Sequence, residues 1–203
     1  MVEFYKGNEV DRDKIQKIKG IAKKGYSPAI FNEYFQNLND VEDLSHLHGI
    51  SIDMERLIIG SNWFICYSES KYFVTILEWI SIDERKNMKQ TLETMNTLKQ
   101  IFIANKGKVF AADMRHDTSY KMYLKMLQDG YFKEINHQYM IDCAAPDEIQ
   151  EIKYKYIEDF LTSSTSDDYV EYFKYILHHL SFILTDKFIE KYGNISFKLE
   201  RKL

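Results

Sequence analysis

Residues 119–134, SYKMYLKMLQDGYFKE, close the stretch of this chain that decides its fold. The stretch runs from Tyr72 to Asp142, and its apolar spacing alternates between the periods of strands and helices. It predicts five elements in the order strand, helix, strand, helix, strand: Tyr72–Ile82, Asn87–Asn105, Lys108–Met114, Thr118–Asp129 and Gln138–Asp142. A helix between two strands favours a right-handed crossover that joins parallel strands, so we expect a mixed α/β fold.

The composition indicates a folded chain without the overall positive charge that attracts nucleic acid. The 203 residues are 45% hydrophobic and 15% aromatic, which is enough to bury a sizeable core. The formal net charge is −4, so no overall basic charge attracts nucleic acid. Lys, Ile, Asn and Tyr are frequent, a bias typical of AT-rich coding DNA such as that of low-GC bacteria and their phages.

A reduced, cytoplasmic compartment is expected. Cys66 and Cys143 are too few and too far apart to indicate a disulfide framework or a zinc site. The first residues, Met1–Lys6, lack the charged-then-apolar pattern of a secretion signal. The longest nearly apolar runs are well short of the roughly 20 residues that a membrane helix needs, so we expect no membrane association.

The N-terminal third predicts a short strand and two helices. Val2–Tyr5 fits the strand, and Asp11 fits the N-cap of a helix that ends at Gly25 in a left-handed turn. Ser27 and the proline after it fit the start of a second helix. Asn39–Gly49 is polar and is expected to be an irregular connection.

A strand pair is expected ahead of the central stretch. Glu55–Ser68 contains two apolar runs separated by Gly60, Ser61 and Asn62, which fit either a tight turn or a bulge.

The pattern changes after Pro146. Glu148–Leu161 and Asp168–Tyr192 predict two aromatic-rich helices, and Ile195–Leu199 a last strand. We therefore expect a domain at residues 1–145 and a C-terminal helical extension at 146–203. Its aromatic side chains occupy more than one helix face, which predicts packing on the core, on a second copy or on another protein partner.

The 119–134 segment resembles the last helix and following strand of the GNAT superfamily of acyl-CoA-dependent N-acyltransferases. The usual pattern there is Asn-x-x-Ala-x-x-Leu-Tyr-x-x-x-Gly-Phe. Ser119 stands at the Asn position, Met122 at the Ala, Gly130 at the Gly and Tyr131 at the aromatic. Over residues 1–145 the resemblance implies a GNAT-like mixed sheet flanked by helices, with acetyl-CoA or another acyl-CoA as the acyl donor.

The chain departs from that family at the junction before the long helix. Family members carry a glycine-rich loop there whose backbone N–H groups bind the coenzyme A pyrophosphate. Ser81–Gln90 contains no glycine. Arg85, Lys86 and Lys89 are the expected substitutes because their side chains offer positive charge to phosphate.

Glu78 is the main catalytic candidate. It interrupts an apolar row formed by Val74, Ile76 and Ile80 on one face of the expected strand. The resemblance implies a general base at a glutamate of this strand. The alternative is a structural carboxylate paired with a neighbouring Lys, Arg or Tyr.

Two further side chains are weaker candidates. His116 follows the end of a strand, where α/β sheets tend to bind ligands, and it suits proton transfer near neutral pH. It fits a solvated loop residue equally well. Met126 stands where the family often has a tyrosine that serves as the general acid. Tyr123 is the nearest phenol and is the candidate for that role here.

No metal site is expected. His46 and His48, and likewise His178 and His179, lack Cys, Asp or His partners at a recurring spacing, so structural roles are favoured.

Two functions follow from these observations. One is an N-acyltransferase that uses Glu78 and an acyl-CoA. The other is a GNAT-fold interaction or structural protein, of the kind a phage encodes, that has lost coenzyme A binding and uses its C-terminal helices for protein contacts.

Overall fold

The computed structural model describes residues 2–48, 51–69, 73–82, 89–112, 117–135 and 180–194. The chain divides into two compact units. The first comprises Met1–Ser70, Ile76–Asn105 and Asn194–Leu203, and the second comprises Lys71–Thr75 and Lys106–Gly193.

The strands of the first unit follow one another in the order β1-β2-β3-β4. Their bounds are Glu3–Lys6 for β1, Glu55–Ile59 for β2, Trp63–Glu69 for β3 and Phe73–Ser81 for β4. β1 and β2 are antiparallel, as are β2 and β3, with Leu57 opposite Cys66. Gly60 N–H donates to the Trp63 carbonyl at 2.9 Å, so the connection that the sequence left open is a tight hairpin turn.

Short helices follow β1 and precede β2. They are η1 (Gly7–Glu9), α1 (Arg12–Gly25), α2 (Pro28–Ile30), the π-helical turn η2 (Phe31–Phe35) and α3 (Val41–His48). Asp11 caps α1 as expected, because its carboxylate accepts from Lys14 N–H at 3.1 Å. Ser27 caps α2 in the same way. The irregular connection expected over Asn39–Gly49 is wrong, since Val41–His48 is helical.

Gly25 ends α1 for a different reason from the one expected. Its backbone is not left-handed, and the helix ends with Tyr26 in an extended conformation. A Cβ at Gly25 would lie 2.2 Å from Cδ1 of Ile80, so the glycine allows α1 to approach β4 closely.

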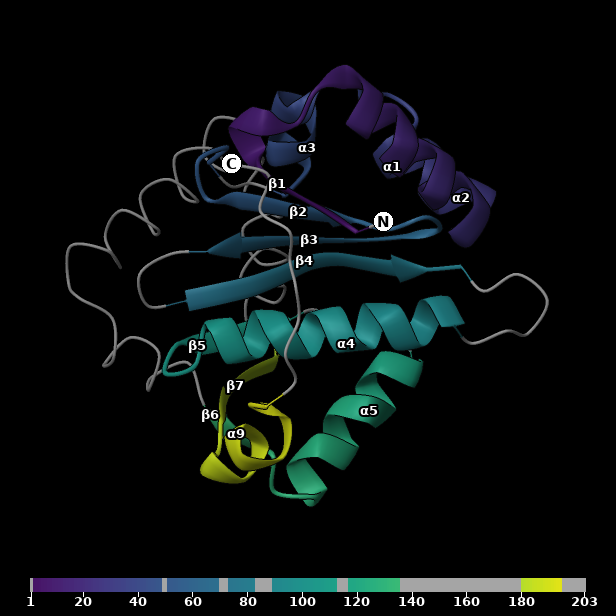
Figure 1. Ribbon diagram of the computed structural model, residues 1–203. Helices are drawn as coiled ribbons and strands as arrows, with labels where there is room; N and C mark the ends of the chain where they lie inside the picture. Colours follow the sequence, from purple (N-terminus) through teal and green to yellow (C-terminus); the bar gives the residue numbers. More distant parts are fainter. Residues whose placement is uncertain are drawn as a thin grey trace, which may run out of the picture. The chain divides into compact units, whose positions relative to one another are not determined.

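Strand alternation separates two faces of this sheet. Leu57, Ile59, Phe64 and Cys66 belong to the core formed with α1, η2 and α3. Trp63 points to the other face, where its indole N–H donates to Glu93 of α4 (Lys89–Ala104) at 2.9 Å. Figure 1 shows α1, α2 and α3 on one side of these strands and α4 on the other.

The strands of the second unit lie in the order β5-β7-β6. Their bounds are Val109–Ala112 for β5, Phe132–Ile135 for β6 and Leu180–Leu184 for β7. β7 is antiparallel to both neighbours, with Phe182 opposite Phe110 and Glu134. Two helices accompany them, α5 (Asp117–Gln128) and α9 (Asp186–Tyr192).

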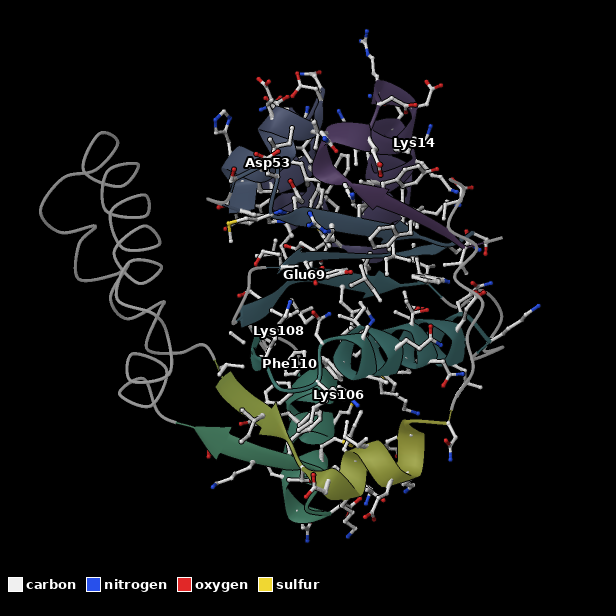
Figure 2. The ribbon with its side chains drawn as sticks, turned by 60° about the vertical axis from the view of Figure 1, so that its left-hand side comes forward. Lys14, Asp53, Glu69, Lys106, Lys108 and Phe110 are labelled. Carbon is white, nitrogen blue, oxygen red and sulfur yellow. The ribbon has the colours of Figure 1, made fainter. Side chains whose placement is uncertain are left out.

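Aromatic rings fill the core of the second unit. Phe110, labelled in Figure 2, stacks on Phe182 with 5.6 Å between ring centroids. Phe182 also stacks on Phe132 at 4.2 Å and contacts the Tyr123 ring at 5.7 Å. Gly130, with φ of 72°, provides the left-handed turn that leads from α5 into β6.

The expected fold class is confirmed. The chain is mixed α/β, with seven mostly antiparallel strands in the described residues and flanking helices. The single helix expected over Asp168–Tyr192 is wrong in part, because Leu180–Leu184 is a strand that pairs with β5 and β6. The elements expected at 138–142, 148–161 and 195–199 lie outside the described residues, as does the boundary at 145/146. None of the described helices combines the length and apolar character of a membrane span.

Candidate functional site

Glu78 lies on β4 and is oriented by a phenol of α1's C-cap. The hydroxyl of Tyr26 donates to Oε2 of Glu78 at 2.5 Å. The Tyr26 ring is itself held by stacking on Phe35, with 5.3 Å between centroids. Among the described residues no hydrogen bond or ion pair engages Oε1 of Glu78. The carboxylate is therefore positioned through one oxygen, and Oε1 is able to accept a proton.

Of the other residues expected to act with Glu78, the structure describes Lys89 and Tyr123. Lys89 is exposed at the first residue of α4. Tyr123 is only 1% exposed and packs within the aromatic core of the second unit. Arg85, Lys86 and His116 lie outside the described residues.

A second cluster of reactive side chains lies on the α1–α3 face of the first unit. Oε1 of Glu55 lies 3.1 Å from Nδ1 of His48 and 3.0 Å from Sγ of Cys66. Sγ of Cys66 lies 3.8 Å from Nδ1 of His48. The other oxygen of Glu55, Oε2, accepts a hydrogen bond from the Ser45 hydroxyl.

Regular elements bring this cluster together. Ser45 and His48 are on α3, where they are three residues apart and so share a helix face. Glu55 is the first residue of β2, and Cys66 lies opposite Leu57 on β3. Because Glu55 and Leu57 point to the same face of β2, Glu55 and Cys66 are diagonal neighbours on that face. Arg56, which follows Glu55, donates from Nη1 to the carbonyl of Asp53 at 2.6 Å. This hydrogen bond stabilises the turn before β2, where Asp53 is labelled in Figure 2.

The cluster is buried, and its charges depend on one another. The side chains of His48 and Glu55 are 6% and 0% exposed. Burial opposes ionisation of Glu55, but the hydrogen bond and charge of His48, with further bonds from Ser45 and Cys66, outweigh it and lower the pKa of Glu55. Burial raises the pKa of the Cys66 thiol, and the charges of Glu55 and Glu78 raise it further.

This arrangement does not activate Cys66 as a nucleophile. Cysteine nucleophiles need a lowered pKa and a base of their own. Here Glu55 and Cys66 both face the same nitrogen of His48, so no relay runs from a carboxylate through the imidazole to sulfur. Nitrogen, oxygen and sulfur donors instead converge on one point, as the ligands of a metal ion do.

The sequence patterns did not indicate this cluster. His48 is 7 residues from Glu55, and Glu55 is 11 residues from Cys66, spacings that match no metal-binding motif. One signal was present, since Glu55 stands in the alternating row of Leu57 and Ile59, as Glu78 does in its own strand. A carboxylate in an apolar row indicates a buried partner, but it does not tell which.

Comparison with known proteins adds little to these contacts. No family model matches the chain. No curated protein matches it either. Among solved structures, the chain is similar to the PaiA N-acetyltransferase from Thermoplasma acidophilum in complex with coenzyme A, at 12% identity and a TM-score of 0.39. The match covers 67% of this chain and 92% of that one. A likeness of this size carries no argument about the site, which has to be judged from its own residues.

Proposed function

We propose that this chain is a divergent, acyl-CoA-dependent N-acyltransferase-like protein in which Glu78 is the general base. The contact with Tyr26 is a pairing that the structural alternative also predicts, so the observation that carries the proposal is the second oxygen of Glu78, Oε1, which this contact leaves unengaged. One carboxylate oxygen is fixed at 2.5 Å from a phenol, and the other has no partner among the described residues. A half-buried carboxylate held in this way, on the strand where the GNAT resemblance implies a base, is suited to accept a proton from an amine.

The reaction follows from that role. The amine nitrogen attacks the thioester carbon of the acyl-CoA, and the C–N bond forms as Oε1 of Glu78 takes a proton from nitrogen. The C–S bond then breaks, the coenzyme A thiolate leaves and takes a proton from solvent, and Glu78 returns its proton to solvent. Backbone N–H groups of the strands are expected to stabilise the oxyanion between these steps.

Phosphate binding in this proposal relies on side chains. Without a glycine loop, Arg85, Lys86 and Lys89 have to supply charge through flexible side chains, which bind phosphate less well than a preformed backbone nest. We therefore expect weaker coenzyme A binding than a glycine loop provides. Tyr123 receives no role in this mechanism, because its ring is enclosed by Phe132 and Phe182.

Ligand binding is the first test. Thermal unfolding of the full chain is followed with increasing acetyl-CoA, and isothermal calorimetry gives the dissociation constant. A ligand that binds the native state has to raise the melting temperature by mass action. Absence of both a shift and a heat signal at millimolar acetyl-CoA overturns the enzyme proposal.

Variants then separate binding from chemistry. Glu78→Gln is expected to lower kcat by about 10²- to 10⁴-fold with unchanged acetyl-CoA affinity, as the loss of a general base does. Glu42→Gln, on the exposed surface of α3, is the matched control. Lys89→Ala is expected to weaken acetyl-CoA binding with kcat unchanged, and exposed Lys121 of α5 provides its control. An acylation rate that is unaltered in Glu78→Gln excludes Glu78 as the base.

The second candidate is an interaction or structural protein without catalysis. The missing glycine in Ser81–Gln90 favours it, since that loop is what the family uses to bind coenzyme A. A second copy or another protein would then bind to the aromatic C-terminal segment. Sedimentation that finds only a monomer, together with measurable acetyl-CoA binding, decides against this alternative.

A further inference from the structure

We propose that Nδ1 of His48, Oε1 of Glu55 and Sγ of Cys66 form a zinc-binding site, a property separate from acyl transfer. The three atoms come from α3, β2 and β3 of the first unit, and all lie within 4.8 Å of one another. A site supported by regular elements is held in place more firmly than one on loops.

The donor separations suit tetrahedral zinc. The three pairs are 3.1 Å apart for nitrogen and oxygen, 3.0 Å for oxygen and sulfur, and 3.8 Å for nitrogen and sulfur. Zinc bonds of about 2.0–2.3 Å at tetrahedral angles place donors about 3.3–3.6 Å apart, so the largest difference from the ideal value is about 0.6 Å, for the oxygen–sulfur edge. The three atoms thus form one face of a tetrahedron, and small side-chain shifts complete it.

Charge balance favours a divalent ion at this buried position. A carboxylate, a thiolate and a neutral imidazole carry two negative charges, which a Zn²⁺ ion neutralises. On binding, the Cys66 thiol and Nδ1 of His48 each release a proton to solvent, so that sulfur binds as a thiolate and Nδ1 through its lone pair, while the ring keeps a proton on Nε2. The burial that opposes a free thiolate is thereby offset by direct bonding to the metal.

The donor set favours zinc over Mg²⁺, Ca²⁺ and Cu⁺. Mg²⁺ and Ca²⁺ prefer oxygen ligands and are poorly served by sulfur and imidazole. Cu⁺ prefers sulfur ligands and is poorly served by a carboxylate. Three protein ligands of mixed type leave a fourth position for water or another small ligand.

Ser45 orients the carboxylate of this site. Its hydroxyl donates to Oε2 of Glu55, which directs Oε1 toward His48 and Cys66. Among the described residues Nε2 of His48 is buried without a hydrogen-bond partner, so Glu55 and Cys66 at Nδ1 are the polar groups that orient the ring. Loss of such an orienting bond typically weakens metal binding by about 10- to 100-fold, and Ser45→Ala is expected to do the same.

The test uses the full chain, stripped with a chelator and kept reduced with a phosphine. Equilibrium dialysis against Zn²⁺ with metal analysis gives the stoichiometry, and Co²⁺ serves as the spectroscopic probe. We expect one zinc per chain, a thiolate-to-cobalt charge-transfer band, and visible bands of tetrahedral intensity. Mg²⁺ and Ca²⁺ are expected to leave the melting temperature unchanged, and Zn²⁺ to raise it. None of these readings needs coenzyme A.

Matched variants assign the ligands. His48→Gln and Cys66→Ser are compared with His46→Gln, an exposed position on the same helix, and with Cys143→Ser. Cys66→Ser is expected to abolish the charge-transfer band, and His48→Gln to weaken Zn²⁺ binding at least 10-fold, with both controls unchanged. Circular dichroism of each metal-free variant checks that it folds. The proposal is overturned if the wild-type chain takes up no zinc, or if the cobalt band survives Cys66→Ser and disappears in Cys143→Ser.

Discussion

Oε1 of Glu55 lies 3.1 Å from Nδ1 of His48, and both side chains are almost completely buried. A buried charge that loses its partner destabilises a protein by about 3–5 kcal/mol, because desolvation is no longer compensated. We therefore expect His48→Leu to lower the free energy of unfolding by about this amount in metal-free buffer. Glu55→Gln is expected to cost only about 1–3 kcal/mol, since its neutral amide still forms hydrogen bonds.

A double-mutant cycle measures this coupling. Urea unfolding of the two single variants and of the double variant, all with EDTA present, gives the interaction free energy. The double variant is expected to be clearly more stable than the sum of the single effects predicts. Additivity within about 0.5 kcal/mol means that the two groups do not interact.

Two glycines of the first unit are expected to respond to alanine in opposite directions. A Cβ at Gly60 would lie 2.2 Å from Nε1 of Trp63, which is buried and bonded to Glu93. Gly60→Ala is therefore expected to destabilise by about 1–3 kcal/mol, as overpacking does. Gly20 lies within α1, and a Cβ added there would meet no atom within 4 Å. Because alanine favours a helix more than glycine does, Gly20→Ala is expected to stabilise the protein by about 0.5–1 kcal/mol. Chemical denaturation gives the change in the free energy of unfolding for each variant. Changes of the same sign in both variants would contradict this account of the turn.

Phe182 is expected to be a major stabilising residue of the second unit. Its side chain is fully buried on β7 and contacts the rings of Phe110, Tyr123 and Phe132. Phe182→Ala is expected to cost about 3–5 kcal/mol, through lost burial and a cavity. Leu124→Ala, at a position that is 44% exposed on α5, serves as the control and should cost much less. If thermal unfolding shows the same loss of stability for Phe182→Ala and Leu124→Ala, Phe182 is not a core residue.

Tyr5 gives the first unit a specific sensitivity to alkali. Burial, with the hydrogen bond and charge of Glu3, raises the pKa of Tyr5 to about 12 from its ordinary value of 10.0. A raised pKa means that the folded chain binds the proton more tightly than the unfolded chain. The resulting stability is fully present below pH 10 and is lost as pH rises toward 12. Tyr5→Phe is expected to show a smaller loss of unfolding free energy over that range.

Urea unfolding of wild type and Tyr5→Phe at several pH values between 8 and 12 checks this, since the other tyrosines contribute equally to both. Parallel pH profiles would show that Tyr5 keeps its ordinary acidity.

Local patterns predicted the elements that local physics determines. Asp11 caps α1 because its side chain meets an N–H only three residues away, and Gly130 ends α5 because its φ is positive. The two apolar runs on either side of Gly60 predicted the residues of β2 and β3, with the choice between a turn and a bulge left open. In each case the deciding interaction lies within a few residues in the sequence.

Local sequence patterns did not predict the contacts between residues that are distant in the sequence. Leu180, Ile183 and Leu184 fit a helix stripe and a buried strand equally well, and pairing with β5 and β6 decides for the strand. The face of Glu78 was predicted, but its partner Tyr26 is 52 residues away. Likewise, the spacing of the cysteines indicated no zinc site, but β2 and α3 place Glu55 and His48 beside Cys66.

The position of β7 between β5 and β6 also affects how the second unit forms during synthesis. β6 leaves the ribosome long before β7, yet β7 is the strand that pairs with it, with Phe132 opposite Leu184. Until residues 180–184 emerge, Phe110 and Phe132 lack the ring of Phe182 that stacks on both of them. The nascent chain therefore carries aromatic rings that only residues 180–184 supply with the ring of Phe182, which makes the packing of this unit dependent on translation through β7.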